Sequence, residues 1–347
     1  MNHNSGSISW KSPSNIAIVK YWGKFGNQLP QNTSISFTLK NAHTVTTLKY
    51  SQKQVQGLPK VDVYFEGKLR PDFGNKSLKF IHKILDEVPC LNKYDFEIHT
   101  ENTFPHSSGI ASSASGMSAL AMCLVELELI QDGGSVTLDD KFRKRASYLS
   151  RLGSGSACRS VYPIMASWGE HPEIINSSNE IATCHENDIH PVFKTFHDDI
   201  LIVSKAEKSV SSTAGHQLME DNPFANARYK QANNNISQIL RILKEGDVPA
   251  FGKIAEDEAL TLHALMMCSD PSYILMEPNT LKLINKIRSY RDKTGVQVYF
   301  TLDAGPNIHL IYPDEVAEIV QGFIKEELAP LCQSILQDLV GDGPSKV

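Results

Sequence analysis

Polar and apolar residues alternate along the first hundred residues in the manner of β-strands. Residues 61–65 alternate with period two, and β-branched and aromatic residues are enriched in 44–50 and 96–99. The continuous apolar run 16–19 predicts a buried strand. Residues 1–15 lack an apolar core of their own, so we expect a disordered or loosely packed arm there.

Apolar residues recur at three- and four-residue spacing through much of the remaining chain, which predicts amphipathic helices. Three apolar or β-rich runs interrupt them, at 200–204, 296–302 and 308–312. Because strands and helices are mixed in both halves, we expect an α+β fold and not a doubly wound parallel sheet. Helices are predicted over 77–85, a long segment after 112, 139–152, 222–243, 248–267, 280–293 and 315–328.

The chain has 347 residues, enough for two domains of ordinary size. A polar stretch at 176–187, followed by Pro191, marks the expected change of domain. We therefore expect an N-terminal domain over 1–190 and a C-terminal domain over 191–347.

Composition narrows the classes of partner. Apolar residues make up 41% of the chain and charged residues 21%, and the net charge is −5. An acidic chain is a poor match for nucleic acid, although a small anion can still bind in a locally basic cleft. The longest apolar run, 119–130, is shorter than the roughly 18–20 residues of a membrane span, and no signal peptide is recognised. We expect a cytoplasmic protein with reduced cysteines and no membrane or nucleic-acid partner.

Residues 104–117 read FPHSSGIASSASGM, a Gly/Ser-rich loop that runs directly into a helical pattern. Such a junction offers unpaired backbone N–H groups and the positive end of a helix dipole, and both favour an anion. The loop lacks the Gly-Lys-Ser/Thr of a Walker A motif and the three glycines of a dinucleotide-binding turn. It predicts a phosphate site, with a plain Ser-rich helix cap as the alternative.

Residues 13–24 read PSNIAIVKYWGK, and the strand predicted there ends in a group of polar side chains. Lys20, Tyr21 and Lys24 follow the apolar run, and Asn15 lies at its start. Lysines at a strand end suit a polyanionic ligand, and a solvated strand end is the alternative.

Residues 152–160 read LGSGSACRS, which places Arg159 among small and apolar side chains. A buried guanidinium is costly without a negative partner, so Arg159 should meet a carboxylate or phosphate of a ligand, or a structural ion pair.

Residues 301–307 read TLDAGPN, with Asp303 at a strand end and before Gly-Pro. This placement fixes the carboxylate on a tight turn and leaves two interpretations open, a catalytic group or a simple turn residue.

These four segments, in this order, resemble the GHMP superfamily of small-molecule kinases and, within it, the mevalonate diphosphate decarboxylases. The pair KYWGK and SGSACRS is specific, because general GHMP kinases do not carry it, and the resemblance extends from Pro13 to about Tyr312. It implies an N-terminal domain like domain 2 of ribosomal protein S5 and a ferredoxin-like C-terminal domain. The active site would lie in the cleft between them.

The resemblance also implies roles for single residues. Asp303 would face the tertiary alcohol of the substrate, Arg159 would hold its carboxylate with the help of Asn15, and Lys20 would complete the catalytic group. The implied ATP-binding residues are Pro105, His106, Ser107, Ser108, Gly109, Ile110, Ala111, Ser112, Ser113 and Ser115, with the Ser113 hydroxyl nearest magnesium. The implied substrate-binding residues are Tyr21, Lys24, Ser154, Gly155, Ser156, Ser211 and Ser212.

The implied reaction is ATP-dependent decarboxylation of mevalonate 5-diphosphate to isopentenyl diphosphate, with ADP, phosphate and CO2 as the other products, by a homodimer that uses Mg²⁺. His106 and Ser107 stand where relatives more often have smaller residues. An arginine that relatives use for the diphosphate is not located here, with Arg70, Lys76 and Lys79 as candidates. Three alternatives therefore stay open: decarboxylation of the 5-monophosphate, phosphorylation at the third carbon alone, and a non-catalytic metabolite sensor.

Overall fold

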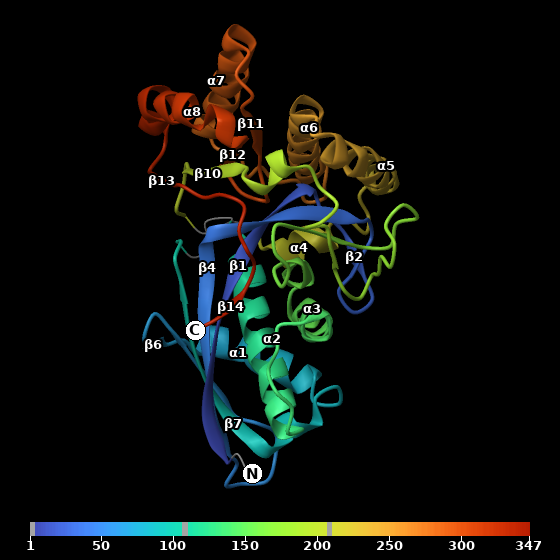
Figure 1. Ribbon diagram of the computed structural model, residues 1–347, viewed down its shortest axis with the longest axis vertical. Helices are drawn as coiled ribbons and strands as arrows, with labels where there is room; N and C mark the ends of the chain where they lie inside the picture. The colour runs from blue at the N-terminus through green and yellow to red at the C-terminus, as the bar shows by residue number, and fades with distance from the viewer. Residues whose placement is uncertain (1–3, 106–109, 207–209) are drawn as a thin grey trace.

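The computed structural model describes residues 4–105, 110–206 and 210–347. In these ranges the chain forms an eight-stranded sheet, a four-stranded sheet and a two-stranded hairpin. The two larger sheets lie in two units that follow one another along the long axis of the molecule (Figure 1). The hairpin pairs β2 (Lys24–Phe25) with β3 (Leu29–Pro30).

Two long antiparallel strands, β1 (Ser5–Val19) and β4 (Ser34–Gln52), form the centre of the eight-stranded sheet. The strand order is β14-β1-β4-β7-β5-β6, with β8 added to β4 and β9 added to β8. The remaining strands are β5 (Val61–Phe65), β6 (Lys68–Leu69), β7 (Tyr94–Asn102), β8 (Met165–Trp168), β9 (Thr183–Cys184) and β14 (Ser345–Lys346).

The expectation of a loose N-terminal arm is wrong for residues 5–15, which form most of β1. Ile8 and Trp10 are 3% and 2% exposed because the alternation of SISW turns both side chains into the core. The indole N–H of Trp10 donates to Glu126 Oε2 at 2.8 Å. Ile8 and Trp10 alone are too weak a local pattern to predict a strand. Residues 5–15 form one because they pair with β4.

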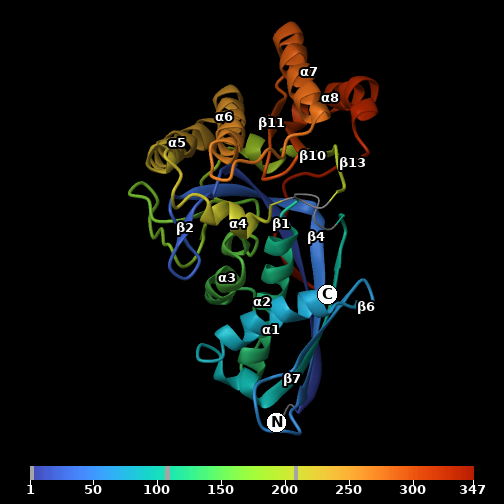
Figure 2. The same ribbon diagram turned by 180° about the vertical axis from the view of Figure 1, so that it is seen from behind.

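Helices α1 (Pro71–Lys83), α2 (Ser112–Gln131) and α3 (Asp140–Gly153) belong to this first unit, and α2 packs against β1, β4 and α3 (Figure 2). By length and composition α2 could cross a membrane, but 67% of its most apolar window is buried inside the protein. Its apolar side chains belong to the core of this unit, as is usual for a central helix. Two 3₁₀ turns, η1 (Pro89–Lys93) and η2 (Gly155–Arg159), follow α1 and α3.

The four-stranded sheet has the order β11-β12-β10-β13. Its core is a second apolar cluster that includes Phe300, Leu310 and Phe323. The predicted helix over 315–328 is divided into 3₁₀, α and π segments. The elements are η3 (Pro191–Lys194), β10 (His197–Ile202), α4 (Ser212–Gln217), α5 (Ala225–Glu245), α6 (Val248–Met267), α7 (Pro278–Thr294), β11 (Tyr299–Thr301), β12 (Ile308–Tyr312), η4 (Asp314–Val316), α8 (Ala317–Phe323), η5 (Ile324–Leu328), η6 (Ala329–Leu331) and β13 (Ser334–Leu336).

The two units share a packed junction. Phe37 of β4 contacts the rings of Phe196 and Phe251 from the second unit, at centroid distances of 5.8 and 5.6 Å. The last residues of the chain return to the first unit, where β14 pairs with β1. Strand β1 also packs against α6 of the second unit, and Lys20 follows the last residue of this strand.

Candidate active site

Lys20 and Asp303 meet across the junction of the two units. Lys20 follows the last residue of β1, and Asp303 lies in the turn between β11 and β12. Lys20 Nζ is 3.0 Å from Asp303 Oδ1, and the two side chains are 2% and 25% exposed. Burial lowers the pKa of Lys20, and the carboxylates of Asp303 and Glu258 oppose that change. The pair therefore joins the two units, and a quarter of the Asp303 side chain stays exposed.

Arg159 is 2% exposed, and its hydrogen bonds within the described residues go to neutral oxygens. Nε donates to Ser36 Oγ at 2.9 Å, and the two terminal nitrogens donate to Ser34 Oγ at 2.5 Å and Asn15 Oδ1 at 3.2 Å. Over the described part of the chain no carboxylate makes an ion pair with it. Burial lowers its pKa, and Asp303 is close enough to oppose that change. Among the described residues, no protein carboxylate supplies the anionic partner that the sequence predicts for Arg159.

Asn15 connects Arg159 to the turn that carries it. Its amide nitrogen donates to Ser156 O at 3.2 Å and to Ser160 Oγ at 2.8 Å, while its oxygen accepts from Arg159. Asn15 is 3% exposed, so both polar ends of the side chain are used in holding β1 against η2.

Gly155 is needed because two aromatic side chains crowd its position. A Cβ added there would lie 2.8 Å from the Trp168 ring and 3.0 Å from the Tyr21 hydroxyl. The Tyr21 ring packs edge-on against Trp168, with centroids 4.8 Å apart, and against His216 at 4.3 Å. The predicted substrate residues Tyr21, Gly155 and Ser156 therefore lie beside Arg159 in one packed group.

The phosphate loop predicted from sequence ends at the N-terminus of α2. Ala111 precedes the helix with a left-handed φ of 43°, and no side chain caps the helix start. Ser113 is exposed, and its hydroxyl accepts from Ser154 Oγ at 3.4 Å, which joins this helix start to the predicted substrate turn. The exposed backbone N–H groups here fit a phosphate.

Not every predicted ATP-binding residue faces solvent. Ser115 is fully buried, and its hydroxyl lies 2.6 Å from Thr44 Oγ1. Ile110 is also buried and its carbonyl accepts from Ser14 at 2.6 Å, whereas Pro105 is exposed and Ser112 half-buried. The predictions at His106, Ser107, Ser108 and Gly109 lie outside the described residues.

A second group of cations lies near the turn that carries the predicted substrate residues Ser154 and Ser156. Burial lowers the pKa of Lys83, and the charges of Arg151 and Lys24 lower it further, so the three cations are neighbours. Lys83 Nζ donates to Leu152 O at 3.0 Å, two residues before Ser154. Lys24 Nζ donates to Gln28 Oε1 at 3.2 Å and lines a hollow of about 210 Å³ with His216 and Tyr229.

Lys83 was missed in the sequence. The three candidates weighed there, Arg70, Lys76 and Lys79, do not join this group: Arg70 pairs with Asp72, and both lysines are exposed. Lys83 lies at the end of the same helix, and its spacing from Lys79 is ordinary for a helix face. Only its hydrogen bond to Leu152 in the last turn of α3 distinguishes it.

Ser211 and Ser212 lie at the start of α4, where the Ser211 hydroxyl accepts from Ala214 N at 3.2 Å. The side chain of Ser212 lies outside the described part of the structure. His216 of α4 is buried between Tyr21 and Trp22 and accepts from Gly23 N at 3.0 Å. Burial, with the Lys24 charge, lowers the pKa of His216 to about 3, so it is neutral at pH 7. This contact fixes α4 beside the Tyr21 end of the site.

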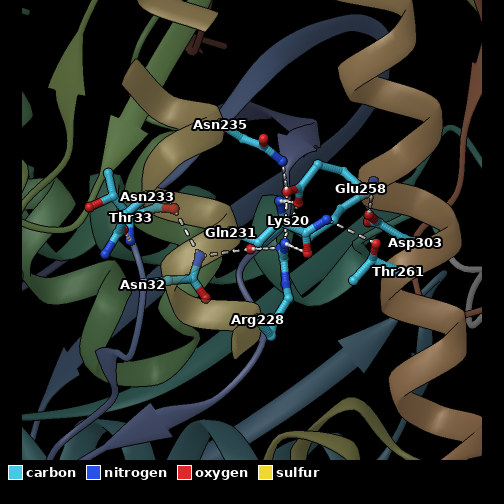
Figure 3. A network of polar contacts seen from close by, with 10 residues as sticks. All are labelled: Lys20, Asn32, Thr33, Arg228, Gln231, Asn233, Asn235, Glu258, Thr261 and Asp303. Carbon is cyan, nitrogen blue, oxygen red and sulfur yellow. Dashed lines mark hydrogen bonds and ion pairs between the residues drawn. The ribbon is translucent and has the colours of Figure 1, made fainter. Parts of the chain in front are cut away.

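Sequence reasoning also missed a polar network behind Lys20, shown in Figure 3. Arg228 of α5 and Glu258 of α6 contact its backbone, and His263 Nε2 lies 3.1 Å from Asp303 O. A signal was present: Glu258 lies among Ala255, Ala259 and Leu262 on an apolar helix face, where an unpaired charge is unfavourable.

Metal ligands are few in this region. Among the described residues, no group of three His, Cys, Asp or Glu side chains could hold a metal ion. The uncapped N-terminus of α2 fits the nucleotide phosphates, and the exposed Ser113 hydroxyl fits as one oxygen ligand of a magnesium ion that arrives with them, since Mg²⁺ keeps much of its water and binds few protein groups.

An uncapped helix start in one α+β unit, together with a Lys20–Asp303 pair that joins this unit to a second one, is typical of a two-domain phosphoryl-transfer enzyme of the GHMP type. Residues 12–179 match the model of the diphosphomevalonate decarboxylase-like N-terminal domain, and 199–344 match the mevalonate 5-diphosphate decarboxylase C-terminal domain. The chain belongs to the diphosphomevalonate decarboxylase family.

Individual relatives agree with this assignment. The diphosphomevalonate decarboxylase of Ganoderma lucidum is 32% identical over 337 residues, which cover 90% of this chain and 80% of the relative. The phosphomevalonate decarboxylase of Haloferax volcanii is 27% identical over 309 residues, covering 88% and 87%. A solved structure described as MDDEF in complex with MVAPP, AMPPCP and magnesium superimposes with a TM-score of 0.83, at 26% identity and 99% coverage of both chains. The predicted α+β, two-domain GHMP-like fold is confirmed.

Proposed function

We propose that the protein catalyses the ATP-dependent decarboxylation of mevalonate 5-diphosphate to isopentenyl diphosphate, releasing ADP, phosphate and CO2. Family membership supports this reaction. The observation that carries it in the structure is Arg159, a buried guanidinium with neutral hydrogen-bond partners, close to the Lys20–Asp303 pair. A substrate that brings both a carboxylate and an alcohol would use both groups.

Asp303 would orient the tertiary alcohol for attack on ATP. A carboxylate of ordinary basicity is too weak to remove the proton of an alcohol in advance. A loose phosphoryl-transfer transition state does not require it, because the proton can pass to Asp303 late in the step. The ion pair with Lys20 would hold the carboxylate in place and add positive charge near the transferring phosphoryl group.

Arg159 would act by orientation. An ion pair to the substrate carboxylate stabilises the ground state, which alone opposes loss of CO2. Its contribution must therefore be to align the carboxylate bond with the departing phosphate. When the C–O bond to phosphate breaks, the electrons of the carbon–carboxylate bond form the alkene and CO2 leaves. Phosphorylation is needed because hydroxide is a poor leaving group.

The phosphates of both substrates would lie along the seam between η2 and α2. The N-terminus of α2 would bind ATP phosphates, and magnesium, when bound with ATP, would neutralise their charge near Ser113. Lys24, Lys83 and Arg151 would hold the substrate diphosphate, with hydroxyls from Tyr21, Ser154, Ser156, Ser211 and Ser212. Remote binding of this kind supports positioning at the reacting carbon.

The test is turnover of mevalonate 5-diphosphate with ATP and magnesium, with ADP and CO2 measured separately. Asp303→Asn should lower turnover by roughly 10²–10⁴-fold. Asp314→Asn is the matched control, since Asp314 is an exposed acid of the same unit paired with His197. ADP without CO2 would indicate a kinase at the third carbon, and preference for the 5-monophosphate would indicate the rival decarboxylase. No turnover with any mevalonate derivative would overturn the proposal in favour of a sensor.

We further propose that the domains divide at residue 190, that two copies form a homodimer, and that the protein is cytoplasmic. The strand order supports the boundary, because β10 to β13 of the second sheet all follow it. The homodimer rests on family resemblance. Sedimentation of the full chain would test the oligomeric state directly.

A further inference from the structure

Arg228 of α5 and Glu258 of α6 form a buried ion pair at the junction of the two units (Figure 3). They are 2% and 0% exposed, and both arms of the guanidinium reach the carboxylate, at 2.7 and 2.5 Å. Asn235 Nδ2 donates to the same carboxylate at 2.6 Å. A buried pair of this kind adds little stability by itself, because desolvation of both ions offsets their attraction.

The pair also binds the backbone of Lys20. Lys20 N donates to Glu258 Oε2 at 2.8 Å, and Lys20 O accepts from Arg228 at 3.1 Å and from Asn32 Nδ2 at 2.9 Å. Lys20 lies just beyond β1, where a buried peptide group needs partners outside the strand ladder. Here side chains from the second unit supply partners to both its N–H and its C=O.

Helix α6 contacts both members of the Lys20–Asp303 pair. Glu258 holds the backbone of Lys20, and His263, five residues further along, contacts the Asp303 carbonyl at 3.1 Å. One rigid helix therefore sets the position of a lysine from the first unit and an aspartate from the second.

We propose that Arg228 and Glu258 are positioning residues for the reaction, which fix the backbone of Lys20 so that its ammonium meets Asp303. The inference rests on the proposed function. Loss of the clamp displaces Lys20 by a fraction of an ångström to an ångström, and such shifts cost roughly 10–100-fold in turnover. ATP binds at the start of α2, so its affinity does not depend on the clamp.

Glu256 provides a matched control on the same helix. It is 4% exposed and pairs with Arg291 at 2.6 Å and Arg288 at 3.3 Å, on the side of α6 that faces α7. Glu258→Gln and Glu256→Gln each remove one buried carboxylate from α6 at the cost of some stability. We expect kcat to fall about 10–100-fold in Glu258→Gln with the KM for ATP within about threefold, and kcat to change less than about twofold in Glu256→Gln.

A double-mutant cycle with Lys20→Met separates positioning from general damage. If the clamp acts through Lys20, adding Glu258→Gln to Lys20→Met lowers kcat little further. Arg228→Lys keeps the positive charge but makes fewer hydrogen bonds to Glu258, so it should fold and lower kcat about three- to tenfold. It takes the place of Glu258→Gln in the test if that variant does not fold. Equal losses in the Glu256 and Glu258 variants, or additive losses in the cycle, would overturn the inference.

A chemical readout keeps this inference distinct from the proposed reaction. The rate at which acetic anhydride labels the Lys20 amine, followed by peptide mass spectrometry, should change severalfold in Glu258→Gln and stay constant in Glu256→Gln. If the wild type turns over no mevalonate derivative, the proposed function fails while the labelling still tests the clamp. Identical labelling in all three proteins would contradict the clamp.

Discussion

Arg159 and Arg228 are equally buried, at 2% exposure, yet their surroundings differ in kind. Arg228 meets a carboxylate with two arms and gives a further bond to a carbonyl. Arg159 instead donates its hydrogen bonds to two serine hydroxyls and an amide oxygen. Its charge is oriented but not neutralised within the described chain.

The difference indicates what each arginine is for. A buried cation with a protein counter-ion belongs to the folded framework, and its removal leaves that counter-ion unpaired. A buried cation held by neutral oxygens keeps most of its electrostatic attraction for a ligand. On this reasoning we propose that Arg228 serves the fold and the position of Lys20, and that Arg159 serves the substrate carboxylate.

The largest expected effect separates the two arginines by stability. Arg228→Met should lower the free energy of unfolding by about 3–5 kcal/mol, because Glu258 is left buried and unpaired. Arg159→Met should cost only about 1 kcal/mol, because hydroxyls can rotate toward other partners. Urea unfolding of both variants measures the difference. Equal losses would remove the distinction between the two sites.

A smaller effect is expected at Lys83, which resembles Arg159 in making no ion pair with a carboxylate within the described part of the chain. The charged groups that act on it, Arg151 and Lys24, are both positive. Lys83→Met should raise the KM for mevalonate 5-diphosphate about tenfold with little change in kcat, since it removes one contact to a phosphate. Lys79→Met on the same helix, exposed in the structure, is the control. Steady-state kinetics with the mono- and diphosphate would show the loss for the diphosphate alone.

The smallest effect concerns pH and comes from the buried His216. Burial lowers the pKa of His216 from 6.5 to about 3, so below pH 6.5 the unfolded chain takes up a proton that the folded chain does not. Stability should therefore decline as pH falls from about 6.5 toward 3, by about 1 kcal/mol between pH 7.5 and 5.5.

His216→Gln should remove that part of the pH dependence. His185, whose pKa burial lowers to about 4, contributes in the same direction and stays in place as an internal reference. Denaturant unfolding at the two pH values measures both contributions. If the free energy of unfolding changes with pH in the variant as much as in the wild type, His216 takes up its proton in the folded protein as it does in the unfolded chain.

Much of this architecture could be predicted from local pattern, and the misses have physical causes. Helix α6 and strands β5 and β12 have the predicted bounds, since their periodicity is long or strict. Residues 5–15 were misjudged because long-range pairing with β4 outweighs their weak apolar pattern. Local sequence contains no information about such a partner.

The site divides in the same way. Lys20, Asp303 and Arg159 lie together because their motifs fix them at a strand end or in a turn, and Asn15 reaches Arg159 from within β1. Ser115 has a place in the predicted phosphate loop, but one further turn of α2 directs it toward Thr44 of the sheet. Glu258 and Lys83 lie on helices whose partners come from distant segments, so only tertiary packing reveals them.

The claim that the Arg159 guanidinium binds the substrate carboxylate is tested most directly by comparing two ligands in calorimetry. Mevalonate 5-diphosphate and an analogue with hydroxymethyl in place of the carboxylate would be titrated into the wild type and Arg159→Met. We expect the wild type to prefer the carboxylate ligand by about 10–100-fold and the variant to bind both ligands about equally. The same preference in both proteins would contradict the assignment of Arg159 to the substrate carboxylate.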